Sequence, residues 1–282
     1  MKTVLDCMES GTQYLEKRGV EDARNNMQWL MASLLGLSRI ELYQQFDRPM
    51  VEDDLAPLRE TLKKRGEGVP LQHLVGTVEF LRREFICDGR GLVPRPETEE
   101  LAEAVLKREF PRPARVLDMG TGSGVLGLSI AAELGEDCHE LVLADLSPEA
   151  LELAGENAAR LELQPTIIRS DLFEGVEGKF ELIVANLPYV PETDRDELSK
   201  EVGHDPDLAL FSGKDGLDAY RRFIPEAAKR LEPNGLLAME FGIGQSSALS
   251  DIAQAAGLTN CELLPDLSGV VRFAYCNTPS TD

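Results

Sequence analysis

A glycine-rich segment between a strand-like run and a helix-like run constrains the fold of this chain most. Residues 114–117 read as a buried strand, and Asp118-Met119-Gly120-Thr121-Gly122-Ser123-Gly124 follows them directly. Residues 125–132 then have the composition of a helix. Glycines allow positive φ and a close approach to a ligand, while a helix N-terminus presents unpaired N–H groups. The order strand, glycine loop, helix therefore predicts a cofactor site in an α/β fold.

Two cofactors are compatible with this loop. Residues 122–127 satisfy the G-x-G-x-x-G pattern of dinucleotide sites, which is weak alone. A second strand, 140–145, ends in Asp145, about twenty residues beyond the loop, the spacing of a carboxylate that holds ribose hydroxyls. NAD and S-adenosylmethionine both carry such a ribose. Asp118 distinguishes the two cofactors. A negative charge at this position does not stabilise a pyrophosphate, whereas it does stabilise the ammonium and sulfonium of S-adenosylmethionine. We therefore expect S-adenosylmethionine.

A third acid, Asp171, follows the short β-branched strand 166–170 and precedes Leu172. At a strand end in the same unit, it is a candidate partner for an adenine amino group. The alternative for both Asp145 and Asp171 is helix capping or turn formation, which Asp often performs. Ser147-Pro148 is a better cap for the helix that follows Asp145.

Asn186-Leu187-Pro188-Tyr189 closes another apolar run, 180–185. Pro188 restrains Leu187 to an extended conformation, so the Leu187 carbonyl is free to accept from a ligand, and Asn186 offers a second acceptor. Two neutral acceptors and the ring of Tyr189 suit a planar NH2 group, either an amide or an aromatic amine. An ordinary Asn-Pro turn is the alternative. The placement of this turn after a cofactor site favours methyl transfer to an amino group.

With these motifs the chain resembles the protein-(glutamine-N5) methyltransferases of the PrmC/HemK type over almost its whole length. Further matching segments are Pro70–Gly76, Glu79-Phe80, Val93–Glu99, Glu201–Ala209, Asp215-Gly216, Glu240–Gly242 and Asp266–Arg272. The resemblance implies methylation of the glutamine in the Gly-Gly-Gln motif of peptide chain release factors, which act in translation termination. It also implies a class I S-adenosylmethionine-dependent methyltransferase fold, Rossmann-like with a seven-stranded mixed sheet.

The family's site residues transfer to matching positions of this chain. The resemblance implies that Asn186 and the Leu187 carbonyl hold the substrate amide, with Pro188 and Tyr189 completing the catalytic motif. The family usually has Asn-Pro-Pro-Tyr, and Leu187 replaces the first Pro; because that position acts through its carbonyl, the acceptor is preserved. The implied cofactor contacts fall into three groups, with Asn186 in addition. Asp118, Gly120, Thr121, Gly122, Ser123 and Gly124 surround the methionine part. Asp145 lies at the ribose, and Asp171 and Leu172 lie near the adenine.

Strands and helices alternate from residue 114 onward, which predicts a doubly wound sheet, and 260–264 with 270–276 predict an antiparallel terminal hairpin. We expect three parts: a helical bundle over 1–75, a β-hairpin linker over 76–93 and the methyltransferase domain over 94–282. The resemblance assigns release-factor recognition to the bundle. Its stripe of Met27, Trp29, Leu30 and Met31 could line a partner groove, but core packing is the preferred interpretation. Glu97 or Thr98 could reach the cofactor, with solvated helix-start charges as the alternative.

The formal charge of −21 argues against nonspecific nucleic-acid binding, which requires Lys and Arg to neutralise phosphates. This weakens the main enzymatic rival, an adenine-N6 nucleic-acid methyltransferase. Acidity suits a protein substrate with basic patches, although a plain solvated surface explains it equally. The remaining rivals are an NAD oxidoreductase and a catalytically silent methyltransferase-like scaffold.

The cysteines and histidines give no sign of metal or thiol chemistry. The five cysteines form no C-x-x-C pair and the three histidines are scattered, so we expect packing roles and no metal. The odd number of cysteines and the lack of a signal peptide indicate a reducing, cytoplasmic location. No apolar run approaches the ~18 residues of a membrane span. We expect a monomer.

Overall fold

The computed structural model describes residues 2–279 and divides the chain into two compact units. The first unit contains the residues up to Val78 together with Ser199–His204, and the second contains Glu79–Leu198 and the residues from Asp205 onward. Among residues 2–279, no helix combines the length and apolar composition needed to cross a bilayer.

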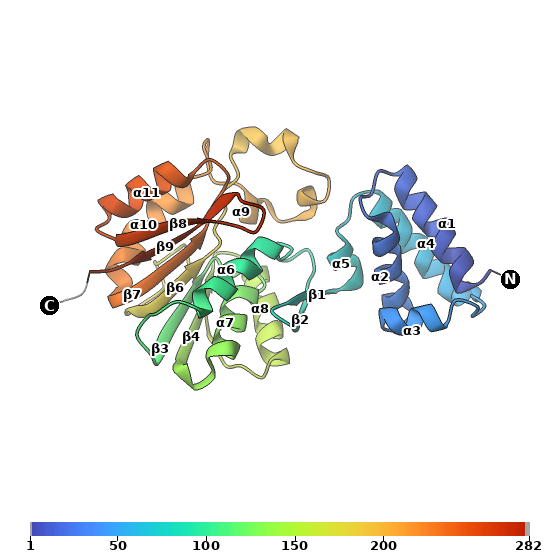
Figure 1. The fold of residues 1–282 in the computed structure, drawn as a ribbon, viewed down its shortest axis with the longest axis horizontal. Helices are drawn as coiled ribbons and strands as arrows, with labels where there is room; N and C mark the ends of the chain where they lie inside the picture. Colours follow the sequence, from blue (N-terminus) through green and yellow to red (C-terminus); the bar gives the residue numbers. More distant parts are fainter. Residues whose placement is uncertain (1, 280–282) are drawn as a thin grey trace. The chain divides into compact units, whose positions relative to one another are not determined.

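Among the described residues, five α-helices build the first unit, and local signals set their ends (Figure 1). They are α1 (Val4–Lys17), α2 (Ala23–Leu35), α3 (Arg39–Gln44), α4 (Glu52–Gly66) and α5 (Leu71–Val75). Gly36 ends α2 in the left-handed conformation, with φ 63°. The Ser38 hydroxyl accepts from the Glu41 N–H while the Glu41 carboxylate accepts from the Ser38 N–H. A glycine therefore sets the end of α2, and a capping box sets the start of α3.

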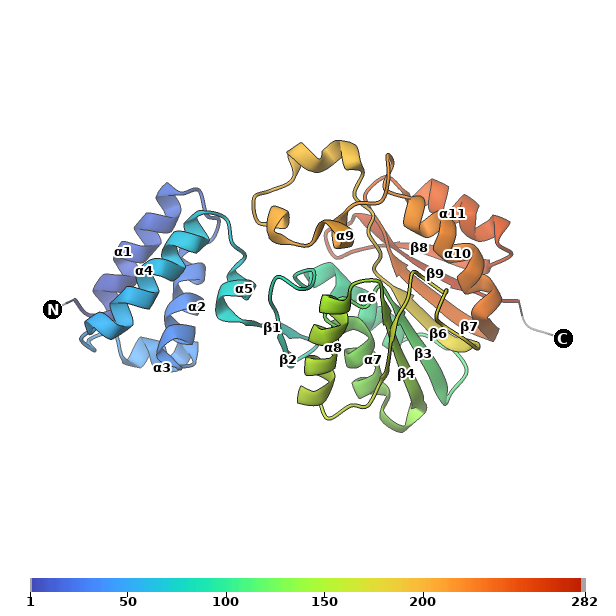
Figure 2. The ribbon, with the colours of Figure 1, turned by 180° about the vertical axis from the view of Figure 1, so that it is seen from behind.

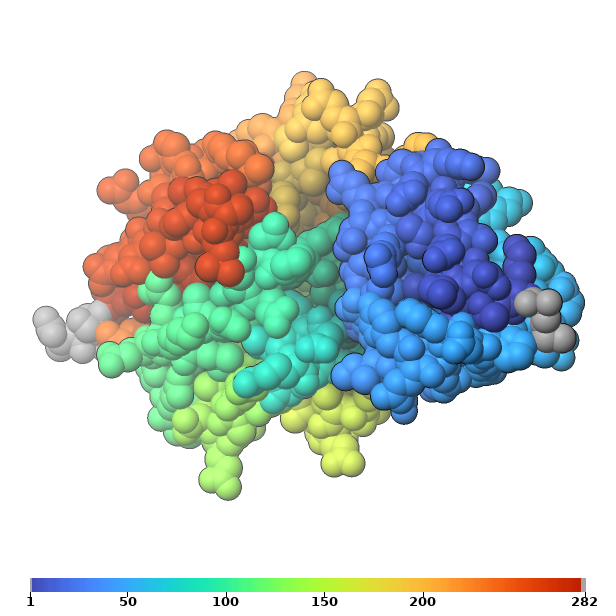
Figure 3. Space-filling view, turned by 45° about the vertical axis from the view of Figure 1, so that its right-hand side comes forward, coloured from blue at the N-terminus to red at the C-terminus, as the bar shows by residue number. Residues whose placement is uncertain are grey.

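The buried core of this unit includes most of the stripe that the sequence singled out. Met27, Leu30 and Met31 are buried, as predicted for core residues. Trp29 is 41% exposed instead, and the Arg39 guanidinium lies 5.4 Å from the centroid of its indole ring. The blue residues of the unit form a close-packed block in the space-filling view (Figure 3).

A buried arginine attaches the segment Ser199–His204 to the first unit. Arg65 is 3% exposed; its Nε donates to Asn26 Oδ1 at 2.7 Å, and its Nη2 pairs with the Glu201 carboxylate. A buried guanidinium is tolerated only when it is paired and hydrogen-bonded. The loop carrying Glu201 therefore belongs to the bundle, although it lies far downstream in the sequence.

The predicted hairpin after the bundle is confirmed. Strand β1 (Thr77–Phe80) pairs with β2 (Arg83–Ile86) in a two-stranded sheet. The two turn residues, Leu81 and Arg82, have φ of 45° and 61°. Positive φ at both central positions suits a tight hairpin turn, although neither residue is a glycine.

The second unit is built on a mixed sheet of seven strands, as the family resemblance implied. The strand order is β5-β4-β3-β6-β7-β9-β8, and β9 runs antiparallel to both β7 and β8. The strands are β3 (Ala114–Met119), β4 (Cys138–Asp145), β5 (Thr166–Arg169), β6 (Phe180–Ala185), β7 (Leu231–Glu240), β8 (Thr259–Pro265) and β9 (Val271–Asn277). Strand β7 begins at Leu231, which already pairs with Phe180 of β6.

Helices cover both faces of this sheet, with α6, α7 and α8 on one face and α10 and α11 on the other (Figures 1 and 2). The helices are α6 (Pro96–Leu106), α7 (Val125–Leu134), α8 (Pro148–Arg160), α9 (Asp207–Leu210), α10 (Asp218–Arg230) and α11 (Ser246–Ala255). Right-handed crossovers from β3 and from β6 run in opposite directions along the sheet, so their helices lie on opposite faces. The order of strands thus reverses between β3 and β6, where a crevice forms at the carboxyl ends.

The terminal hairpin carries a disulfide that the sequence analysis did not foresee. Cys261 on β8 and Cys276 on β9 are bonded, with their Cα atoms 4.1 Å apart. Cys276 is buried in the core and Cys261 packs against it, as predicted for packing residues, but the bond between them was not predicted. Neighbouring positions on antiparallel strands bring the thiols together, and a sequence separation of 15 gives no hint of this. Cys7 and Cys87 are buried, in keeping with packing roles.

The core beside α10 supplies a test of the packing. Phe223 is fully buried and stacks on Phe173, with ring centroids 5.6 Å apart. Phe223→Ala should lower the free energy of unfolding by about 3–5 kcal/mol, because it removes a buried ring and leaves a cavity. Urea unfolding measures this. The control is Leu267→Ala, since Leu267 is 91% exposed and its truncation should cost less than about 0.5 kcal/mol. Equal effects of the two substitutions would contradict the assigned core.

Candidate functional site

Adjacent parallel strands bring the glycine loop and the Asn-Leu-Pro-Tyr turn together. Met119 at the end of β3 pairs with Ala185 at the end of β6, so Gly120 and Asn186 leave the sheet side by side. A Cβ on Gly120 would lie 2.7 Å from Leu187 Cδ2, and φ at Gly120 is 68°. Glycine is required there both for backbone conformation and for contact with the turn. The structure thus brings the two motifs to one edge of the sheet, as expected for a doubly wound sheet.

The Asp118 carboxylate fixes the glycine loop by accepting two hydrogen bonds. This carboxylate is 1% exposed, and Oδ2 accepts from Thr121 Oγ1 at 2.6 Å and from the Gly127 N–H at 2.9 Å. A Cβ on Gly127 would lie 2.7 Å from the Asp118 Cβ, so the third glycine of the G-x-G-x-x-G pattern lets α7 pack on β3. Burial raises the pKa of Asp118 to about 6, against the effect of its two donors.

Asp145, at the end of β4, also fixes the glycine loop through a hydrogen bond. Its Oδ2 accepts from the Gly122 N–H and its Oδ1 from the Ser147 N–H, both at 2.9 Å. The Ser147 hydroxyl caps α8 by accepting from the Ala150 N–H at 3.1 Å, as the sequence predicted. Asp145 therefore does form a turn, yet a carboxylate with two donors keeps lone pairs for ribose hydroxyls. Burial also raises the pKa of Asp145.

Asp171 and Leu172 follow β5, and Leu172 takes a positive φ of 50°. The Asp171 Oδ2 accepts from Arg222 Nη2 at 2.9 Å. Arg222 lies on α10, and the sequence analysis missed it because the pairing depends on how that helix crosses the sheet. The ion pair is largely exposed, so it fixes the Asp171 side chain more than it stabilises the fold.

A cavity of about 370 Å³ lies over these loops. Of the residues predicted to form the site, its walls include Asp118, Gly120, Thr121, Gly122, Ser123, Asp145, Asp171, Leu172, Asn186, Leu187 and Pro188. Gly124 and Tyr189 are not among them, and Gly124 serves instead as the N-cap of α7 with φ 82°. Wall residues that the sequence analysis did not assign include Arg90, Leu92, Pro94, Arg95, Leu146, Leu208 and Arg222.

These walls fit S-adenosylmethionine. Three carboxylates, Asp118, Asp145 and Asp171, face a space that also has apolar walls from Leu92 and Leu146. Carboxylates suit a cationic amino-acid part and ribose hydroxyls, and leucines suit an adenine ring. Among residues 2–279, no three His, Cys, Asp or Glu side chains gather in a way that could hold a metal ion.

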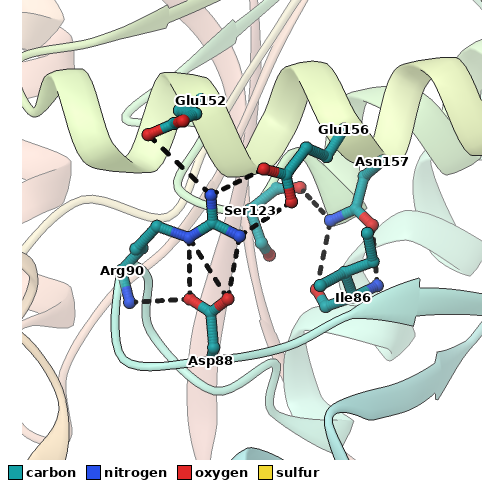
Figure 4. Close-up of polar contacts among 7 residues, drawn as sticks. All are labelled: Ile86, Asp88, Arg90, Ser123, Glu152, Glu156 and Asn157. Atoms are coloured by element: carbon teal, nitrogen blue, oxygen red, sulfur yellow. Dashed lines mark hydrogen bonds and ion pairs between the residues drawn. The ribbon is translucent and has the colours of Figure 1, made fainter.

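The segment before α6 forms one side of the cavity and is tied to the glycine loop by Asn157 of α8 (Figure 4). The fully buried Asn157 accepts from the Ile86 N–H at 2.7 Å and donates to the Ser123 carbonyl at 2.9 Å. Figure 4 also shows Arg90 held by Asp88, Glu152 and Glu156. These contacts place Arg90, Gly91 and Leu92 against the cofactor cavity.

The backbone of the Asn-Leu-Pro-Tyr turn is fixed by side chains from α10 and from the start of α11. The Leu187 N–H donates to the Tyr220 hydroxyl at 3.3 Å, and Gln245 Nε2 donates to the Tyr189 carbonyl at 2.9 Å. The Tyr220 hydroxyl also lies within hydrogen-bonding distance of the Glu240 carbonyl and, at 3.4 Å, of the Leu187 carbonyl. Because a carbonyl oxygen has two lone pairs, the Leu187 carbonyl can still accept from a ligand.

The side chains of this turn converge on Glu240 at the end of β7. Asn186 Nδ2 donates to Thr98 Oγ1 at 2.9 Å and to Glu240 Oε2 at 3.2 Å. The Tyr189 hydroxyl donates to Glu240 Oε1 at 3.1 Å. Among residues 2–279, no hydrogen bond engages Asn186 Oδ1, so that oxygen is the free end of the amide. Thr98 lines the cavity and Glu97 does not; the contact between Glu240 and Asn186 becomes visible only once the strand order is known.

Family models match both parts of the chain. The PrmC N-terminal domain model matches residues 6–76, and the methyltransferase small domain model matches residues 98–205. Two solved structures share the fold. A ribosomal protein L11 methylase from Lactobacillus delbrueckii subsp. bulgaricus has a TM-score of 0.50 and 22% identity, covering 65% of this chain and 80% of that one. A methyltransferase from Pyrococcus furiosus has a TM-score of 0.52 and 19% identity, covering 70% and 89%.

Relatives named release factor glutamine methyltransferase align with nearly the whole chain. The relative from Deinococcus radiodurans is 40% identical over 95% of this chain and 96% of its own length. The relative from Geobacter sulfurreducens is 38% identical over 92% of this chain and 91% of its own length. That from Koribacter versatilis is 34% identical over 99% of this chain and 100% of its own length. The chain belongs to the release factor glutamine methyltransferase family.

Proposed function

We propose that this enzyme transfers a methyl group from S-adenosylmethionine to the side-chain amide nitrogen, N5, of the glutamine in the Gly-Gly-Gln motif of release factors. The observation that carries the proposal is the placement of two acceptors, Asn186 Oδ1 and the Leu187 carbonyl, beside the glycine loop in one cavity. The names of the aligned relatives support the same substrate. An adenine-N6 nucleic-acid methyltransferase has no comparable support.

The substrate sets the chemical task, because an amide nitrogen shares its lone pair with the carbonyl and is a poor nucleophile. S-adenosylmethionine supplies a methyl group on a sulfonium, which is open to in-line displacement. Asn186 and Leu187 accept both N–H hydrogens of the glutamine amide, which favours a pyramidal nitrogen and orients its lone pair. The methylated nitrogen is acidic and then loses its proton. The reaction needs no dedicated general base and no covalent enzyme intermediate.

The cofactor contacts are assigned by position in the cavity. Asp118 and the loop from Gly120 to Gly124 surround the methionine part, Asp145 binds the ribose, and Asp171 with Leu172 borders the adenine. Asp118 acts through its charge and by fixing the loop, since both donors to its Oδ2 come from the protein. Gly124 contributes through the start of α7. The neutral amide of Asn186 touches the cofactor without forming a charge pair that would stabilise the ground state.

The parts of the chain divide the work. Residues 1–75 recognise the release factor, 76–93 link the two domains, and 94–282 carry out methyl transfer. A charge of −21 suits a protein substrate with basic patches and disfavours direct nucleic-acid binding. The enzyme acts as a monomer in the cytoplasm, where its substrate works.

The substrate assignment is tested by incubating the enzyme with S-adenosylmethionine and the release factor of its host. Peptide mass spectrometry should locate one added methyl group, 14 mass units, on the glutamine of the Gly-Gly-Gln motif, as follows from replacing one amide hydrogen by a methyl group. A release factor with that glutamine changed to alanine is the control and should stay unmodified. Methylation at another residue would overturn the assignment.

Asn186→Ala should lower kcat by about 10²–10³-fold, the usual loss when one preorganised polar group is removed from a reacting centre. The dissociation constant for S-adenosylmethionine should change by less than about threefold, because the main partner of Asn186 is the substrate amide. Single-turnover methylation and calorimetric titration measure the two quantities. Retained turnover would show that the amide is held elsewhere.

The raised pKa of Asp118 predicts a pH-dependent affinity for the cationic cofactor. Below the pKa of about 6 the carboxyl is mostly protonated in the free protein, and binding a cation favours its ionised form. Binding must then expel the proton, so affinity should fall between pH 7 and 5, by at most about tenfold per unit for this group. Asp118→Asn should flatten that fall, as measured by titration calorimetry across this range. Parallel profiles for the two proteins would contradict the assignment.

A further inference from the structure

The proposed mechanism does not use Glu240, a buried carboxylate in the site. Glu240 is 1% exposed, lies at the carboxyl end of β7 and does not line the cavity. Strands β6 and β7 pair in parallel with Ala185 opposite Met239, so the next residues, Asn186 and Glu240, meet as both strands end. A carboxylate buried at such a point is costly unless several donors surround it.

Three donors surround the Glu240 side chain. Oε2 accepts from Thr98 Oγ1 at 2.7 Å and from Asn186 Nδ2 at 3.2 Å, while Oε1 accepts from the Tyr189 hydroxyl at 3.1 Å. A carboxylate accepts at both oxygens, which matches a ring of donors and no acceptor. Burial raises the pKa of Glu240, opposed by the hydrogen bonds from Thr98 and Tyr189 and by the charge of Arg272, while Glu97 raises it further.

This arrangement decides which way the Asn186 amide points. The two ends of an amide have nearly the same shape and opposite polarity. The Thr98 hydroxyl gives its hydrogen to Glu240, so toward Asn186 it acts as an acceptor, 2.9 Å from Nδ2. Both neighbours of this end of the amide therefore accept hydrogen bonds. A flipped Asn186 would place Oδ1 against a carboxylate oxygen and a hydroxyl oxygen, so the flip is disfavoured.

We propose that Glu240 is a positioning residue for methyl transfer. It holds the Asn186 amide with Nδ2 turned inward and Oδ1 turned to the substrate, and its charge, acting through the Nδ2–H bond, makes Oδ1 a stronger acceptor. The Thr98 hydroxyl favours the same orientation of the Asn186 amide, because it also accepts from Nδ2. This inference rests on the proposed function, and in it Glu240 contacts neither substrate nor cofactor and takes no proton from the glutamine.

Glu240→Gln is the most direct test, because glutamine keeps the shape but offers Asn186 a donor as well as an acceptor. The variant should lose about 10–100-fold in kcat, the usual effect of removing a partner that orients a reacting group. Its dissociation constant for S-adenosylmethionine should stay within about twofold of the original. The matched control is Glu181→Gln on β6, whose carboxylate accepts from the Arg115 N–H at 2.7 Å; it should retain full activity.

A double-mutant cycle separates positioning through Asn186 from an independent role. In an Asn186→Ala background, Glu240→Gln should change kcat by less than about twofold, because no amide remains to be oriented. If the decreases in kcat caused by the two single substitutions multiply in the double variant, the inference is overturned. That result would indicate that Glu240 acts independently of Asn186, for instance as a base. If the original enzyme fails to methylate the release factor, the proposed function fails instead, so the two failures are distinguishable.

Substitutions at Thr98 keep the test decisive if Glu240→Gln does not fold. Thr98→Ser retains the hydroxyl and should keep kcat within about threefold, whereas Thr98→Val removes it at the same size and should lower kcat about tenfold or more. Thermal unfolding and cofactor affinity are measured in parallel to confirm that both variants are folded. Equal activity of the serine and valine variants would contradict an orienting role for the Glu240–Thr98 pair.

Discussion

The parallel pairing of β3 with β6 is the constraint on which the rest of the site depends. It places the ends of the two strands in register, Met119 beside Ala185, at the point where the strand order of the sheet reverses. The glycine loop and the Asn-Leu-Pro-Tyr turn then leave the same edge and contact each other through Gly120 and Leu187. The order of the strands in the sheet alone therefore brings the methyl donor and the methyl acceptor together.

Burying polar groups around this edge is costly, and hydrogen bonds between neighbouring loops offset that cost. Asp118 ties the loop to the start of α7, and Asn157 ties it to the end of β2. Glu240 ties the catalytic turn to α6 through Thr98. Buried groups connected in this way resist rearrangement, because breaking one contact leaves an unpaired polar atom. The result is a rigid site that can orient a weak nucleophile.

Much of this could be predicted from the sequence, since the features concerned are local. The glycine loop, the capping box at Ser38, the end of α2 at Gly36 and the hairpin near Leu81 are set by residues close together in the chain. The order of strands and helices followed from alternating patterns, and the mixed sheet from the family resemblance. Both are confirmed by the observed topology.

The remaining features depend on tertiary packing, which local patterns do not report. Arg222 reaches Asp171 only because of how α10 crosses the sheet, and Glu240 reaches Asn186 only because β7 lies next to β6. The disulfide between Cys261 and Cys276 has the same origin, in the register of β8 with β9. The hydrogen bond from the Tyr189 hydroxyl to Glu240 likewise depends on the order of the strands. In each case the missing information is which strands or helices are neighbours.

The most direct measurement is a crystal structure of the enzyme with a release factor and S-adenosylhomocysteine, the demethylated cofactor. The account predicts that Asn186 Oδ1 and the Leu187 carbonyl oxygen each lie about 3 Å from the side-chain nitrogen of the Gly-Gly-Gln glutamine, within hydrogen-bonding distance. It also predicts that Asn186 Nδ2 stays on Glu240 in that complex. A glutamine amide bound away from these two oxygens, or an Asn186 amide turned with its nitrogen toward the substrate, would contradict the central claim.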